Sequence, residues 1–190
     1  MWQVPQESKP APGELLLVQA FVNTWDGDRG TDILLDPAAA AGWLVNAGLW
    51  DGPGAPDLYE LDFARRLREA LRLVLVSHNG GPVPAPGELQ PLRALSAATT
   101  LSMDIGPDGA MTLQPARGGR LETELARLLL LVRDAQLLGT WRRLKACRDP
   151  RCRWAFYDRS HSQQGAWCEM RVCGNRAKNR RFRQRPGQRA

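Results

Sequence analysis

Residues 147–173 read CRDPRCRWAFYDRSHSQQGAWCEMRVC, and this stretch contains all four cysteines of the 190-residue chain. The cysteines follow the spacing C-x4-C-x15-C-x4-C, which is two close pairs separated by a longer loop. Two such pairs can supply the four thiolates that zinc binds in a tetrahedron. The spacing therefore predicts one structural zinc ion, with Cys147, Cys152, Cys168 and Cys173 as its ligands.

Two disulfides or four unlinked thiols are the alternative interpretations of these cysteines. The chain starts MWQVPQESKPAPGE, which lacks the basic start and apolar run of a signal peptide, so we expect a cytoplasmic protein. Clustered cysteines in a reducing compartment bind metal more often than they form disulfides. A catalytic zinc is disfavoured, because catalytic sites keep an open coordination position and four thiolates close the shell.

Aromatic residues between the cysteine pairs indicate a small folded module. Residues 153–158 (RWAFYD) alternate like a strand, and residues 159–165 are polar like a loop. Residues five apart on a helix point about 140° away from each other, so we expect Cys168 on a turn and Cys173 near the start of a helix. The side chains expected to form the apolar core of the module are Trp154, Phe156, Trp167 and Phe182.

The charges of the chain are unevenly distributed. Residues 139–190 carry 15 Lys/Arg and 3 Asp/Glu, a net charge of +12, whereas residues 1–138 carry 11 and 17, a net charge of −6. A segment this basic must be solvated or meet an anion. A phosphate backbone would relieve its internal repulsion through charge-assisted hydrogen bonds. We therefore predict nucleic-acid binding, with double-stranded DNA as the first expectation.

The basic residues are concentrated in a predicted helix that follows Cys173. Helical spacing puts three of these basic residues on one face of the helix and three on an adjacent face. The first face carries Arg176, Arg180 and Arg183, and the adjacent face carries Lys178, Arg181 and Arg185. The alternatives are a solvated basic tail, or positive charge that balances an anionic zinc–thiolate centre.

The rest of the chain predicts a mostly α fold with a small β-hairpin. We expect a helical N-terminal domain, residues 1–140, and a small C-terminal zinc-binding module, residues 141–190, with a strand or hairpin and a basic helix. Hydrophobic periodicity and capping residues predict the following elements: a helix or strand over 15–24, helices over 38–49, 57–77 and 88–98, a hairpin over 100–105 and 110–114, and one long helix over 121–146.

Few residues suggest catalysis, so we expect that the protein is not an enzyme. The two histidines, His78 and His161, lie in predicted loops, and no HExxH motif or phosphate-binding glycine loop occurs. No apolar run is long enough to span a bilayer, which leaves no expected membrane partner.

A group of polar residues in the N-terminal domain is a candidate ligand site. Asn23 and Thr24 follow an apolar run, and they could line a pocket together with Asp32, Trp43 and Arg68. Taken one at a time, these residues have simpler explanations. Asn23 and Thr24 would cap a turn, Arg68 would form a surface ion pair, and Trp43 would fill the core.

Two parts of the chain resemble known families. The segments 152–154 (CRW), 156–160 (FYDRS), 167–170 (WCEM) and 173–178 (CGNRAK) resemble the CGNR zinc finger, over residues 143–186. The segments 21–24 (FVNT), 32–34 (DIL), 43–44 (WL) and 67–71 (LREAL) resemble the ABATE domain of stress-induced transcription regulators, over residues 14–140. The resemblance implies a zinc-dependent DNA-binding finger on a ligand-sensing domain, and it strengthens the candidate ligand site.

The leading hypothesis is therefore a zinc-dependent, DNA-binding transcription regulator of the stress response. Its N-terminal domain would sense a small molecule of unknown identity, and the protein would act alone or as a homodimer. The long helix over residues 121–146 would link the two domains mechanically. The alternatives are an RNA-binding or ribosome-associated module and, less favoured, an enzyme whose finger only localises it.

Overall fold

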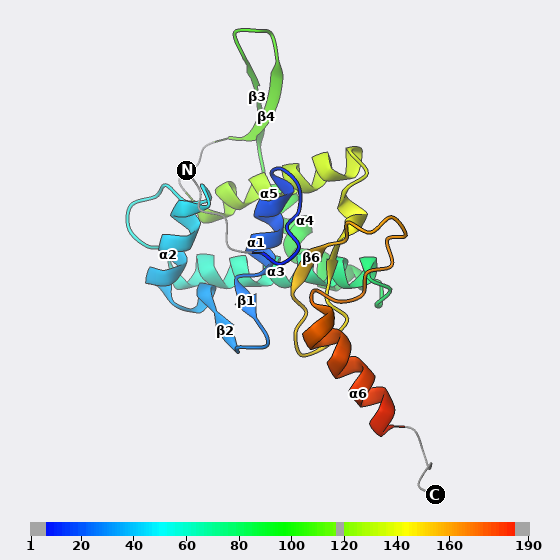
Figure 1. The fold of residues 1–190 in the computed structure, drawn as a ribbon. Helices are drawn as coiled ribbons and strands as arrows, with labels where there is room; N and C mark the ends of the chain where they lie inside the picture. Colours follow the sequence, from blue (N-terminus) through cyan, green and yellow to red (C-terminus); the bar gives the residue numbers. More distant parts are fainter. Residues whose placement is uncertain (1–6, 117–119, 185–190) are drawn as a thin grey trace, which may run out of the picture.

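Helices make up most of the structure, a computed structural model that describes residues 7–116 and 120–184 (Figure 1). The helices are α1 (Leu15–Val22), α2 (Pro37–Asn46), α3 (Leu58–His78), α4 (Gln90–Ala98), α5 (Leu121–Leu137) and α6 (Asn175–Arg183). Six short strands form three antiparallel pairs: β1 (Trp25–Asp26) with β2 (Thr31–Asp32), β3 (Leu101–Ile105) with β4 (Met111–Pro115), and β5 (Leu144–Ala146) with β6 (Ala155–Tyr157). The predicted class, mostly α with small β elements, is confirmed.

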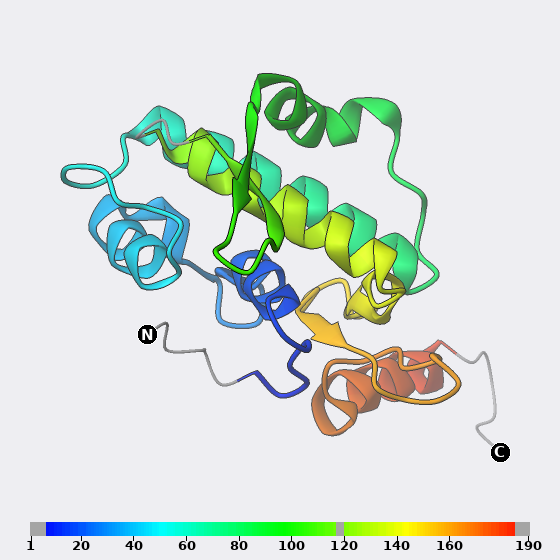
Figure 2. The ribbon, with the colours of Figure 1, turned by 90° about the horizontal axis from the view of Figure 1, so that it is seen from above.

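The long helix α3 is the centre of the N-terminal domain. Asp57 and Glu60 form a reciprocal capping box at its start, which satisfies backbone N–H groups that the first turn leaves unpaired. Its buried residues recur at helical spacing, and α1, α4 and α5 pack against it. Figure 2 shows α3 and α5 lying side by side, with α1 across them. No helix within the described residues is both long and apolar enough to cross a membrane.

Most of the predicted elements occur close to their expected positions. The ambiguous segment over 15–24 is the helix α1, and α2 starts at Pro37 with the side chain of Asp36 as its N-cap. The segment over 88–98 is a 3-10 turn, Pro86–Leu89, followed by α4. The predicted hairpin is β3–β4, with a turn over residues 106–110.

The predicted long helix over residues 121–146 is wrong in its second half. α5 ends at Leu137, Gly139 has a φ of +68°, and the chain continues as a 3-10 turn (Trp141–Arg143) and the strand β5. A left-handed glycine stops a helix, and the apolar residues beyond it pair with β6. Short apolar runs have no period that distinguishes a helix from a strand, so sequence periodicity extended α5 too far.

The zinc-binding module is built on the hairpin β5–β6, whose register pairs Leu144 with Tyr157 and Ala146 with Ala155. Phe156 is fully buried there, and Trp154 and Trp167 are half-buried against the cysteines, as predicted. The prediction that Phe182 belongs to this core is wrong, because its side chain is 78% exposed on α6. The helix turns Arg176 and Arg180 toward Asp149, and this orientation leaves the phenylalanine on the outer side.

Substitution of Gly139 tests whether this glycine ends α5. Gly139→Ala should lower the free energy of unfolding by about 1–2 kcal/mol, because alanine is strained at positive φ. Gly42→Ala is the control in the exposed interior of α2, where an added Cβ meets nothing within 4 Å, and it should stabilise the protein by about 0.5–1 kcal/mol. Urea unfolding of the two variants measures both effects. If both substitutions changed the free energy of unfolding by the same amount and in the same direction, the assignment of Gly139 as the left-handed residue that ends α5 would be contradicted.

Candidate zinc centre and nucleic-acid interface

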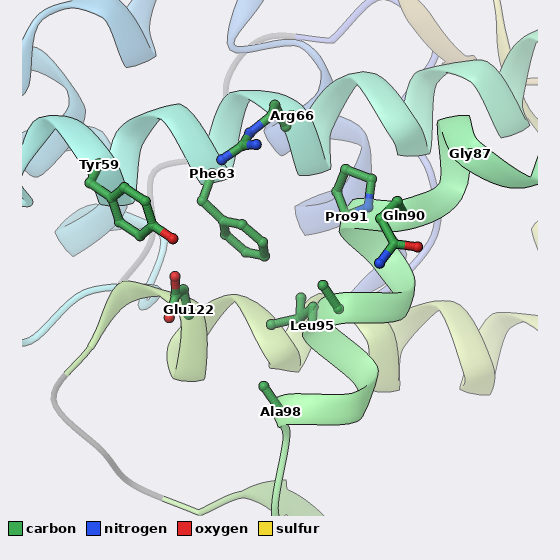
Figure 3. A pocket seen from close by; sticks show the side chains of 10 residues that line it. Tyr59, Phe63, Arg66, Gly87, Gln90, Pro91, Leu95, Ala98 and Glu122 are labelled. Atoms are coloured by element: carbon green, nitrogen blue, oxygen red, sulfur yellow. The ribbon is translucent and has the colours of Figure 1, made fainter.

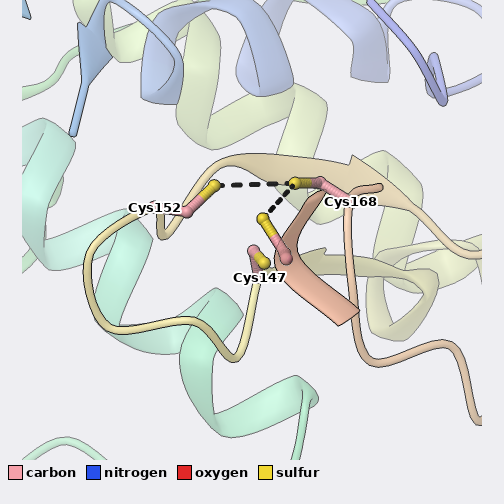
Figure 4. A group of neighbouring side chains, drawn as sticks. Cys147, Cys152 and Cys168 are labelled. Atoms are coloured by element: carbon pink, nitrogen blue, oxygen red, sulfur yellow. Dashed lines mark hydrogen bonds between the residues drawn. The ribbon is translucent and has the colours of Figure 1, made fainter. Parts of the chain in front are cut away.

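The four cysteines form one compact ligand set. Their Sγ atoms all lie within 4.8 Å of one another, and each residue is buried, with 1–7% of its surface exposed. A zinc–sulfur bond of about 2.3 Å implies an edge of about 3.8 Å in a thiolate tetrahedron. The distances between Cys152 Sγ and Cys168 Sγ, 3.5 Å, and between Cys168 Sγ and Cys173 Sγ, 3.7 Å, fit that value. Figure 4 shows Cys147, Cys152 and Cys168 directed at a common centre.

This geometry distinguishes between the interpretations of the cysteines. None of them forms a disulfide, and the two printed sulfur separations are far longer than the S–S bond of about 2.05 Å. Four thiolates satisfy zinc completely and leave no position for water or substrate. The site is therefore a single structural zinc site, and the metal stabilises the fold of the module when it is bound.

Residues after the last ligand shape the start of α6. The chain passes through a π-helical turn, Met170–Gly174, before α6 begins. A Cβ at position 174 would collide with Sδ of Met170, so a larger residue here would require the half-exposed methionine side chain to move. The side chain of Asn175 donates to the carbonyl of Arg171 at 2.8 Å and closes the same turn. These two residues aim the helix away from the zinc site.

Arg176 ties the start of α6 to both domains. Its guanidinium donates to both carboxylate oxygens of Asp28 at 2.6 Å and to Cys173 Sγ at 3.2 Å. Its Nε lies 2.9 Å from Oδ2 of Asp149, a close ion contact without the alignment of a hydrogen bond. The hydrogen bond from Arg176 lowers the pKa of Asp28 below its usual range. Arg176 thus offsets the negative charge of the thiolates and fixes the helix.

Asp149 is a functional residue that the sequence analysis missed. Its side chain is fully buried between the first two cysteines, where it accepts a hydrogen bond from Arg180 at 3.2 Å and contacts Arg176. A buried carboxylate needs positive partners, and α6 supplies two of them. Asp149 is one of three acidic residues within the +12 segment, and this scarcity was the available signal, but only the fold shows which arginines it binds.

The structure describes five of the six predicted nucleic-acid-binding residues and divides these five into two groups. Arg176 and Arg180 face Asp149, although Arg180 stays 41% exposed at its side chain. Lys178, Arg181 and Arg183 are exposed, and no carboxylate within the described part of the chain pairs with them. Figure 1 shows α6 extending away from the body of the protein. Arg185 lies outside the described residues.

Asn23, a predicted ligand-binding residue, instead joins the N-terminal domain to the zinc module. Its amide nitrogen donates to the carbonyl of Ala155 at 3.0 Å, and its Oδ1 accepts from the N–H of Ala155 at 2.7 Å. These are the two bonds that a neighbouring strand would make to β6. Asn23 also donates to Glu7, whose buried position raises its pKa. The sequence contains no pattern that predicts this pairing across 132 residues.

Further side chains of the N-terminal domain bind the backbone of the module in the same way. Gln19 donates to the carbonyl of Ala155, Arg72 to that of Arg153, and Asn79 to those of Ala146 and Ala166. Gln19, Arg72 and Asn79 are all buried. In return, Arg148 donates to the carbonyl of Asn79 at 2.7 Å. Buried polar groups are costly unless paired, so the two parts of the chain depend on each other.

Three of the other predicted ligand residues form a buried network next to Asn23. Arg68 donates to Asp32 through two bonds of 2.6 and 2.8 Å and to Thr24 Oγ1 at 3.2 Å. Burial raises the pKa of Asp32, but the hydrogen bond and charge of Arg68 lower it more, so the carboxylate stays ionised. Trp43 packs against Phe21 with a ring separation of 6.2 Å. The structure therefore brings Thr24, Asp32 and Arg68 together, and Trp43 lies in the core.

Comparison with protein families agrees with these features. Residues 16–140 match the ABATE family, described as "Putative stress-induced transcription regulator", and residues 143–186 match the CGNR zinc finger. The chain belongs to the ABATE family. The CGNR tetrapeptide is residues 173–176, which are the last zinc ligand, the glycine of the π turn, the asparagine that closes it and the arginine that anchors α6. No curated protein matches the sequence.

The ABATE domain contains a cavity of about 490 Å³, away from the predicted ligand residues (Figure 3). It lies between the first half of α3, α4 and the start of α5. Phe63 and Leu95 form apolar walls, and Tyr59, Arg66 and Glu122 add polar groups around them. None of the five predicted ligand residues lines this cavity.

Zinc content tests the assignment of the four cysteines. The purified protein should contain one zinc ion per chain, and Cys168→Ser should lose it, because serine does not supply a soft thiolate ligand. Elemental analysis gives the stoichiometry. Ser162→Ala, in the exposed loop between the cysteine pairs, should keep the metal. Full hydrogen-exchange protection of residues 141–184 in metal-free protein would contradict the zinc site.

Asn23→Ala tests the junction between the ABATE domain and the finger. It removes the partner of the N–H of Ala155, and an unsatisfied buried donor costs about 1–3 kcal/mol. Thermal unfolding should show this loss, whereas Asn46→Ala, at an exposed position of α2, should have little effect. Zinc stoichiometry should stay at one. Equal stability of the two variants would show that the bonds to Ala155 contribute nothing.

Proposed function

We propose that this ABATE-family protein is a DNA-binding transcription regulator whose contact surface is the exposed side of α6. The observation that carries the proposal is the division of charge on this helix. Arg176 and Arg180 are turned toward Asp149, whereas Lys178, Arg181 and Arg183 are exposed without carboxylate partners in the described chain. Exposed, unpaired cations on a projecting helix are suited to phosphate oxygens.

The shape of this surface supports duplex DNA as the partner. A single helix fits the major groove, and α6 projects from the finger with its outer side uncovered (Figure 1). Phe182 is exposed among the cations, where it can contact thymine methyl groups or base edges. Membership in a family of transcription regulators supports DNA over RNA. Stronger displacement by structured RNA than by duplex DNA would favour the RNA-binding alternative.

The zinc site contributes by fixing the helix rather than by chemistry. Zinc, when bound, holds the four thiolates of the finger in one tetrahedron. The contacts of Arg176 and Asp149 then set the rotation of α6, so that the remaining cations face outward. Cysteines that bind zinc must stay reduced, and this supports a cytoplasmic location. The role of the family as regulators supports a non-enzymatic function.

For the sensing role, we favour the cavity beside α3 as the site of a small-molecule effector. Phe63 of α3 lines the cavity, and Arg72, nine residues further along the same helix, binds the finger at the carbonyl of Arg153. Nine residues of helix span about 14 Å. A ligand that favours one position of α3 would therefore shift the finger, provided that it binds the two positions differently. Arg68, which binds Asp32 and Thr24, lies on α3 between Phe63 and Arg72.

Replacing the exposed cations tests the DNA surface. The triple variant Lys178→Ala, Arg181→Ala and Arg183→Ala should weaken binding to duplex DNA. It should also reduce the slope of log K against log salt by about 0.9 for each lost phosphate contact. Fluorescence anisotropy titrations at several salt concentrations measure the slope.

The matched control for this prediction is Arg93→Ala, an exposed arginine on α4 of the ABATE domain. It removes a positive charge far along the chain from α6 and should leave the slope unchanged. Zinc content should be the same in both variants. A slope unaffected by the triple substitution would eliminate α6 as the DNA-binding surface.

A further inference from the structure

The hairpin β3–β4 has one entirely apolar face. Its register pairs Leu101 with Pro115, Met103 with Leu113, and Ile105 with Met111. Residues opposite each other in an antiparallel pair share a face, and alternate residues along a strand return to that face. The six residues therefore form a single surface, named here the hairpin face.

The hairpin face is exposed to solvent. Leu101, Met103, Ile105, Met111 and Leu113 keep between 37% and 67% of their surface accessible. The other face of the hairpin is polar, with Ser102, Asp104, Thr112 and Gln114, and Gln114 donates to Asp104 across it. Figure 1 shows the hairpin standing out from the helices. Contiguous apolar patches of this kind on a protein surface mark interaction sites.

The protein's own helices cover this face only in part. β4 contacts α5, but its residues Met111–Pro115 also line a gap of about 590 Å³ beside that helix, and most of the hairpin face stays exposed. An isolated two-stranded hairpin is marginally stable in water. This hairpin has five residue pairs, and covering its apolar face would stabilise it.

We propose that the hairpin face is the contact surface of a homodimer, in which the hairpins of two copies pack their apolar faces together. The face has no charged side chain, so a second copy meets it without repulsion. The two arginines beside the gap are paired within the chain, Arg127 with Glu14 at 2.7 Å and Arg133 with Asp134 at 2.6 Å. A two-fold interface requires a self-complementary patch, and a neutral apolar ribbon meets this requirement.

The size of the hairpin face sets the expected strength of the dimer. A specific interface buries about 1,000 Å² or more in total, about half from each partner. Six apolar side chains per copy reach only the lower end of this range, so the dimer should dissociate on dilution. The hairpin and α6 project toward opposite ends of the molecule in Figure 1, so dimerisation leaves the DNA-binding surface uncovered. The proposal therefore holds whether or not α6 binds DNA.

Sedimentation velocity of the zinc-loaded full chain, over a series of concentrations and without DNA, tests the proposal. The wild type should approach twice the mass of the chain as its concentration rises. The variant Ile105→Thr with Met111→Thr keeps strand-forming residues at a pair in the register, and it should raise the dimer Kd at least about tenfold. Unchanged zinc content and far-UV circular dichroism would show that the variant is folded.

The control variant is Val45→Thr with Val83→Thr, which removes exposed apolar groups away from the hairpin and should dimerise like the wild type. A wild type that stays monomeric at every concentration would overturn the proposal and leave the face to a different protein. Dimerisation that the hairpin substitutions do not weaken would overturn it as well, because the contact would then lie elsewhere.

Discussion

The pairing of Asn23 with Ala155 is the interaction on which the arrangement of the two domains depends. One carboxamide satisfies both the N–H and the carbonyl of a strand residue in the finger. The edge of β6 would otherwise be unpaired and buried, which is unfavourable for backbone groups. Lys9 extends the same edge, because its carbonyl accepts from the N–H of Tyr157. The N-terminal domain thus takes the place of a third strand, and the finger is fixed to it rather than tethered.

Charge in the finger has two separate roles. Within the protein, Arg176 and Arg180 neutralise Asp149, Asp28 and the neighbouring thiolate. Lys145 does the same for Asp158, which also accepts from Ser160 and Gly165 and so organises the loop between the cysteine pairs. Burial raises the pKa of Asp158, but these hydrogen bonds lower it by a larger amount, so the carboxylate stays ionised. The cations that remain exposed on α6 are those available to an external anion.

The helix α3, rather than α5, connects the distant parts of the molecule. Its first half lines the cavity at Phe63, and its second half binds the finger through Arg72 and its C-cap Asn79. α5 stops at Leu137 and reaches the finger only through a turn. A single continuous helix therefore contacts the cavity with its first half and the finger with its second half.

The sequence by itself determined the zinc ligands, the mostly helical class, the bounds of α2 and α3 to within a residue or a few, and the hairpin over 100–114. These features follow from local signals: two cysteine pairs, capping residues at Asp36 and Asp57, and a turn that contains Gly109. Only the tertiary structure decided what the polar and basic residues do. Asn23 and Arg68 have the composition of a ligand site, and only the structure shows that their partners are Ala155 and Asp32. The basic residues of α6 are alike in sequence, and the position of one buried carboxylate, Asp149, separates Arg176 and Arg180 from the exposed cations of the described helix. Contacts between residues far apart in the chain leave no periodic pattern, and so no local rule predicts them.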